Sequence, residues 1–139
     1  THRDNTTRVK TLCGQLDQPM AALIADLQLR GLLESTLIIW MGDFGRTPTL
    51  GKQGGRDHFP RAWTTLLAGG GVPGGQVVGS TNTQGTDILD RPISAVDFMA
   101  TVCTILEIDY KKEFYTREGR PIRPVDKGEK LITELLSKV

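Results

Sequence analysis

The chain has 139 residues, of which 38% are hydrophobic and 24% charged, and its formal net charge is +1. These values are typical of one globular domain with a hydrophobic core. The scattered basic residues exclude an extended nucleic-acid surface, and no apolar run approaches the length of a membrane span. Cys13 and Cys103 are too few for a disulfide framework, so both are interpreted as core or half-buried residues.

The first predicted element is an amphipathic helix over about Thr7–Leu29. Its apolar residues recur at spacings of three and four along the segment. Pro19 interrupts this pattern, because proline removes a helical hydrogen bond. The sequence therefore predicts either one kinked helix or two abutting helices, ending near Gly31.

Two apolar runs, Leu37–Met41 and Ala62–Leu67, have the length and composition of strands. A parallel pair needs a long crossover that is usually helical, and no helical pattern lies between the runs. The sequence thus favours an antiparallel pair. The connecting loop of roughly twenty residues is rich in glycine and charge, and such loops are usually functional or disordered.

The segment after Leu67 contains a G-x-G-x-x-G pattern at Gly69, Gly71 and Gly74. A dinucleotide site requires that this pattern open a helix. Pro73 and the strand-like residues 76–78 follow instead, so a glycine turn between short strands is predicted.

The C-terminal third is predicted to contain two helices separated by a loop. Ser94 can cap a helix over roughly Ser94–Leu106, and Tyr110–Asp126 is polar and reads as a surface loop. A short helix over Gly128–Lys138 would turn four apolar residues inward (Leu131, Ile132, Leu135 and Leu136). Helices flanking a few strands indicate an α/β fold.

The long loop carries the residues best suited to chemistry. Asp43 leaves the first strand, where open α/β sheets bind ligands, although aspartate before a glycine-rich turn is also commonly structural. His58 precedes the second strand and could be a metal ligand, an acid/base group or a structural residue. If the strands are antiparallel neighbours, Asp43 and His58 lie at the same rim of the sheet. Arg46 and Arg56 could bind a phosphate or sulfate group, or could pair with loop carboxylates.

Three blocks of sequence resemble a bacterial family, domain-of-unknown-function family 1501. The blocks are RGLLESTLIIWMGDFGRTP, GRDHFPRAWTTLLAGGGVPGGQVVGST and DRPISAVDFMATV, preceded by Thr1-His2 and Asn5. The resemblance covers almost the whole chain, and the blocks occur in the order found in the family. Members are similar to the superfamily of alkaline phosphatases, sulfatases and phosphoglycerate mutases.

The resemblance implies a fold and a site. It implies that residues 1–139 form one C-terminal segment of a three-layer α/β/α sandwich of the alkaline-phosphatase type, truncated at its N-terminus, with the nucleophile upstream. His2, Asp43 and His58 then correspond to ligands of a divalent metal: zinc, manganese or calcium. Phe44 departs from the superfamily pattern, because it occupies the position of a metal-binding histidine.

The leading hypothesis is the C-terminal portion of a metal-dependent hydrolase for phosphate or sulfate esters, inactive by itself. The alternative is a non-catalytic α/β module that binds an anion or a polymer through Arg46 and Arg56. Expected partners are a small anionic ester or a sulfated or phosphorylated polymer. Self-association through uncovered sheet surface is a further expectation. The family resemblance also suggests export to the periplasm.

Overall fold

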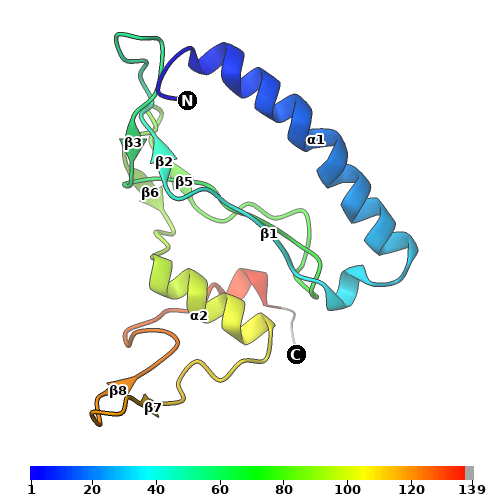
Figure 1. Cartoon of the computed structure of the whole chain (residues 1–139), viewed down its shortest axis with the longest axis vertical. Coiled ribbons are helices and arrows are strands. Elements are labelled where there is room, and N and C mark those ends of the chain that lie inside the picture. Colours follow the sequence, from blue (N-terminus) through cyan, green and yellow to red (C-terminus); the bar gives the residue numbers. More distant parts are fainter. Residues whose placement is uncertain (137–139) are drawn as a thin grey trace.

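The computed structural model describes residues 1–136, which form a small mixed α/β domain with two α-helices and four antiparallel strand pairs (Figure 1). In chain order the elements are α1 (Asn5–Leu29), the 3-10 helix η1 (Leu33–Ser35), β1 (Ile38–Trp40), β2 (Gly45–Arg46), β3 (His58–Phe59), β4 (Leu66–Ala68), β5 (Ser80–Thr81), β6 (Ile88–Asp90), α2 (Ala95–Ile105), β7 (Phe114–Tyr115), β8 (Pro121–Ile122) and the 3-10 helix η2 (Thr133–Leu135). The pairs are β1–β4, β2–β3, β5–β6 and β7–β8. No helix within residues 1–136 combines the length and the apolar character needed to cross a membrane.

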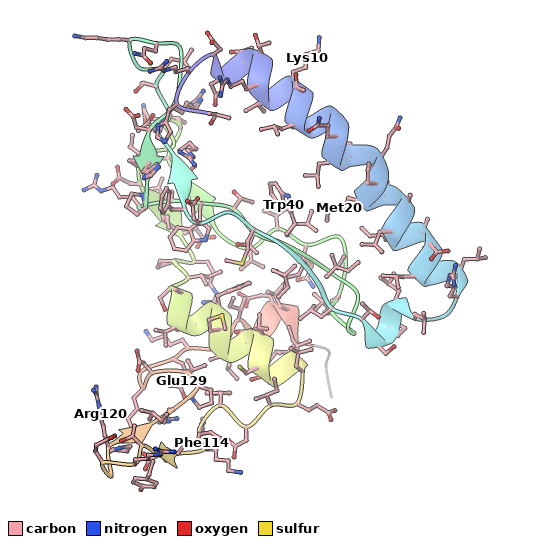
Figure 2. All side chains as sticks on the ribbon, in the orientation of Figure 1. Lys10, Met20, Trp40, Phe114, Arg120 and Glu129 are labelled. Atoms are coloured by element: carbon pink, nitrogen blue, oxygen red, sulfur yellow. The ribbon has the colours of Figure 1, made fainter. Side chains whose placement is uncertain are left out.

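The helix α1 is one continuous element that contains Pro19. It begins at Asn5, two residues earlier than expected, and of the two predicted alternatives the structure has a single helix and not two abutting ones. Figure 2 shows Met20 on the side of α1 that faces β1 and Trp40, whereas Lys10 points away. Much of the apolar side nevertheless stays exposed, and Cys13 is exposed too, contrary to the interpretation of a core or half-buried residue.

The strands β1 and β4 confirm the predicted antiparallel pair, with Ile39 opposite Leu67. The second strand lies later than expected, at Leu66–Ala68, because residues 62–65 are irregular. The glycines that follow form a turn and open no helix, as predicted, but the strand-like residues 76–78 are irregular and the next strand is β5. At Gly69 the φ angle is +71°, and a Cβ atom would lie 2.3 Å from the carbonyl oxygen of Thr36. Only glycine allows this turn to pack against the end of η1.

The helix α2 was predicted correctly from its cap. The Ser94 hydroxyl accepts a hydrogen bond from the Asp97 backbone N–H, and the Asp97 carboxylate accepts one from the Ser94 N–H. This reciprocal capping box satisfies donors that have no partner inside the helix. The buried face of α2 packs against Tyr110 and Val125, which follow the helix in the chain, and together they form the small core of the domain.

The C-terminal predictions require two corrections. Among the described residues, Gly128–Lys138 contains only the 3-10 helix η2 and not an α-helix, while residues 137–139 lie outside the described part. Ile132 is buried as expected, with 1% exposure, but it is held by a hydrogen bond from its N–H to the Thr101 hydroxyl. The segment predicted as a surface loop contains the β7–β8 hairpin, and its ends enter the core.

Candidate functional site

The N-terminal residues are attached to the long loop by backbone contacts. Arg3 forms a β-bridge with Gly54, and the Arg56 N–H donates to the Thr1 carbonyl at 3.1 Å. A Cβ atom at Gly55 would lie only 1.8 Å from the His2 carbonyl oxygen. Glycine at position 55 therefore permits the close approach that brings His2 to the loop.

His2 and His58 face each other at this junction. Their Nε2 atoms lie 3.1 Å apart, and their ring centroids are 4.9 Å apart. His58 is placed by the β2–β3 pair, in which it lies opposite Arg46. The β2–β3 pair and the attached N-terminus thus bring together two imidazoles that are 56 residues apart in the sequence.

The partners of His2 define its tautomer. Its Nδ1 lies 3.1 Å from the Asp57 carboxylate, which can only accept when ionised, so Nδ1 carries the proton. Arg46 Nη1 lies 3.3 Å from His2 Nε2 and can only donate, so Nε2 presents its lone pair. A histidine oriented by a carboxylate at one nitrogen, with a lone pair at the other, has the arrangement found in many metal ligands.

Arg46 and Phe44 complete the surroundings of the two histidines. The Phe44 ring packs against the His58 ring at a centroid distance of 4.3 Å, and the Arg46 guanidinium lies 5.6 Å from the Phe44 ring. Asp43 Oδ1 accepts a hydrogen bond from the Phe44 N–H at 3.0 Å and lies 4.0 Å from Arg46 Nη2. The Asp43 carboxylate thus reaches the cluster through Arg46.

Arg56 has a different environment from Arg46. Its Nη1 donates to the carbonyl oxygens of Thr47 and Pro48 at 2.6 and 2.5 Å. The guanidinium therefore ties the two sides of the loop together. Of the two arginines expected to bind an anion, the structure places Arg46 beside the histidines and uses Arg56 within the loop.

The spacing of the two imidazole nitrogens can be compared with the spacing of two histidine ligands on one zinc ion. Two imidazole nitrogens bound tetrahedrally to one zinc ion at about 2.1 Å lie roughly 3.4 Å apart. The two Nε2 atoms, at 3.1 Å, are close to that spacing. No group of three or more histidine, cysteine, aspartate or glutamate residues with metal-binding geometry occurs among residues 1–136. Among the described residues, the cluster therefore brings together two imidazole nitrogens.

Asp57 is a site residue that the sequence reasoning did not select. In an extended segment neighbouring side chains point to opposite faces, so sequence adjacency alone does not place Asp57 and His58 in one cluster. The structure satisfies this rule because Asp57 contacts His2, which comes from a different part of the chain. The available signal was the Asp57-His58 dipeptide, together with a second histidine elsewhere in the sequence.

Comparison with known proteins identifies a family without a described activity. Searches among curated proteins and among solved structures gave no significant match. A family model described as "Protein of unknown function (DUF1501)" matches residues 1–136, nearly the whole chain. The chain therefore belongs to the DUF1501 family.

Proposed function

We propose that this chain forms the two-histidine part of a divalent-metal site for phosphate or sulfate esters, in a fold of the alkaline phosphatase and sulfatase type. The observation that carries this proposal is the 3.1 Å separation of the His2 and His58 Nε2 atoms, with His2 Nδ1 directed at Asp57. Imidazole nitrogen favours zinc over calcium, which prefers oxygen ligands. Zinc is therefore the metal we assign first, ahead of manganese.

Each residue of the cluster has a role in this proposal. His2 and His58 hold the metal, and Asp57 keeps His2 in the tautomer that presents Nε2. A bound zinc ion would polarise an ester oxygen and neutralise charge that develops on it. Phe44 packs against His58 and restricts its ring.

Arg46 links metal binding to anion binding. Its guanidinium and the His58 Nε2 atom both lie within hydrogen-bond distance of His2 Nε2, whose lone pair a metal requires. An anionic ester would draw the guanidinium away, because a bidentate arginine–phosphate contact is charge-assisted and stronger than a bond to neutral imidazole. Metal and anion should therefore bind with positive coupling at this site.

Zinc titration by calorimetry tests the proposal. The wild-type chain should bind one zinc ion, and His2→Ala and His58→Ala should each weaken binding at least tenfold, because either change leaves one imidazole ligand. Lys52→Ala, in the same loop, serves as the control because it leaves both imidazoles in place. Equal zinc affinity in the wild type and in both histidine variants would refute the proposal.

A second candidate function is metal-independent binding of an anion or an anionic polymer. The specific observation in its favour is that Arg46 lies beside His2 and Asp43 without requiring a metal. Phosphate binding in the presence of a chelator, lost in Arg46→Gln and unchanged in His58→Ala, would select this alternative. Binding that depends on added zinc and on His58 would select the metal site.

A further inference from the structure

A large cleft lies beside β4 and the start of α2. It has a volume of about 810 Å³, within the usual range for small-molecule sites, and it runs between the β1–β4 pair and the first turns of α2. Residues 62–67 and 72–81 form much of its wall, and Met41, Phe98, Met99 and Ile132 add apolar side chains.

The charge of this cleft suggests what it can bind. Among the described residues that line it, Arg91 is the single charged one. Its guanidinium is already bound by Glu134, with Nε and Nη2 donating to the two carboxylate oxygens at 2.7 and 2.9 Å. The cleft therefore offers apolar contact and no unpaired charge for an anion among these residues.

The lining of the cleft approaches β2, the strand that carries Arg46. Met41 lines the cleft and is two residues before Asp43. Ala62 also lines the cleft, and its carbonyl lies so close to Gly45 that a Cβ atom there would be 1.7 Å from the oxygen. Gly45 directly precedes Arg46 in β2. A ligand whose charged group contacts Arg46 would thus have apolar surface adjoining it.

We infer that the cleft binds the apolar body of an anionic ester, so that the ligands of this protein are phosphate or sulfate esters of an aromatic or other bulky apolar alcohol. The inference rests on the proposed function, because it takes the charged group of the ligand to bind at Arg46 and the histidines. Met41, Trp63 and Met99 leave more than two-fifths of their surface exposed and would be covered by such a ligand.

A pair of sulfonates tests this inference without the complication of hydrolysis. Calorimetric titration of the zinc-loaded chain would compare naphthalene-1-sulfonate with methanesulfonate, which carries the same charge without the apolar body. We expect naphthalene-1-sulfonate to bind at least ~10-fold more tightly, because each buried carbon adds affinity in an apolar site. Equal affinity of the two sulfonates would overturn the inference while leaving the zinc site intact.

Two substitutions, one in α2 and one at the residue that caps its C-terminus, provide a matched comparison. Met99 lines the cleft and is 47% exposed, whereas Leu106 is 48% exposed and does not line it. Met99→Gln should reduce the advantage of naphthalene-1-sulfonate roughly threefold or more, and Leu106→Gln should leave it unchanged. Equal effects of the two variants would overturn the assignment of the cleft, provided that circular dichroism shows both to be folded.

Two further outcomes separate this inference from the proposed function. Arg46→Gln should weaken both sulfonates by the same factor, because it removes the contact to the charged group alone. If naphthalene-1-sulfonate binds while zinc does not, and Arg46→Gln has no effect, the proposed function and its link to the cleft both fail. Self-association that disappears in Met99→Gln would overturn the inference in favour of a protein contact at the cleft.

Discussion

His2 and His58 lie 56 residues apart in the sequence, yet their Nε2 atoms are separated by 3.1 Å. The contact depends on two independent attachments. The β2–β3 pair places His58, and the bridge between Arg3 and Gly54 places His2. Disrupting either attachment should separate the imidazoles without changing any residue of the cluster.

The tight contact at Gly55 provides the first prediction. Gly55→Ala would force a Cβ atom to within 1.8 Å of the His2 carbonyl, so the N-terminal segment must move. We expect loss of zinc binding and destabilisation of about 1–3 kcal/mol, as for other overpacked contacts. Gly51→Ala is the matched control, because its nearest atom would be 3.8 Å away, an ordinary contact distance. Unchanged zinc affinity in Gly55→Ala, measured by calorimetry, would contradict this role.

Asp57 provides a prediction about orientation. Asp57→Asn retains the size of the side chain but removes the negative charge beside His2 Nδ1. Replacement of such partners typically costs ~10–100-fold in metal affinity, so we expect a loss of at least tenfold. Competition with a chromophoric zinc chelator would measure it, with Asp109→Asn in an exposed turn as the control. An effect no larger than that of the control would show that Asp57 does not orient His2.

Thr101 provides a prediction about the core. It is 1% exposed, and its hydroxyl donates to the Asp97 carbonyl at 2.7 Å and accepts from the Ile132 N–H at 3.0 Å. Thr101→Val keeps the shape but leaves a buried N–H without its acceptor, at a cost of about 1–3 kcal/mol. Thr104→Val, whose hydroxyl donates to Ala100 within the same helix, should cost less. Urea denaturation would compare the two variants, and equal losses would argue against this link between α2 and the C-terminal segment.

The ion pair between Arg91 and Glu134 provides a prediction about pH. The hydrogen bond from Arg91 lowers the pKa of Glu134 from its ordinary 4.5 to about 2. Because the folded-state pKa is lowered, the stabilisation is present above pH 4.5 and is lost as pH falls toward 2. The free energy of unfolding should therefore decline through this window. The difference between the wild type and Glu134→Gln should shrink over the same range. A difference independent of pH would refute this linkage.

The sequence predicted local elements better than their assembly. Ser94 and the spacing of apolar residues identified α2, and the absence of a helix between two apolar runs predicted the antiparallel pairing of β1 with β4. The α-helix predicted over Gly128–Lys138 does not occur in its described part, residues 128–136, where a tertiary hydrogen bond to Thr101 fixes Ile132 instead. Apolar periodicity carries no information about such a bond.

The sequence predicted only part of the candidate site, because the rest depends on tertiary contacts. His2, Asp43 and His58 were selected from residue type and family resemblance, and the structure places His2 and His58 in contact, with Asp43 linked to them by Arg46. The contact of Asp57 with His2 and the role of Arg56 within the loop depend on which backbone segments lie side by side. The Arg3–Gly54 bridge, which decides this, has no signature in the sequence.

The uncovered helix α1 has a consequence for the evolution and engineering of this chain. Its N-terminal end is fixed to the loop by hydrogen bonds from Asp4 and Asn5, and beyond its C-terminal end η1 is held by the Gly70 N–H (Figure 1). Its 25 residues span roughly 37 Å, and this length determines the position of His2 relative to the loop. One inserted residue would rotate the N-terminal end by about 100° and advance it by about 1.5 Å. Substitutions along the exposed surface of α1 should thus be tolerated, whereas changes in its length should move His2 out of reach of His58.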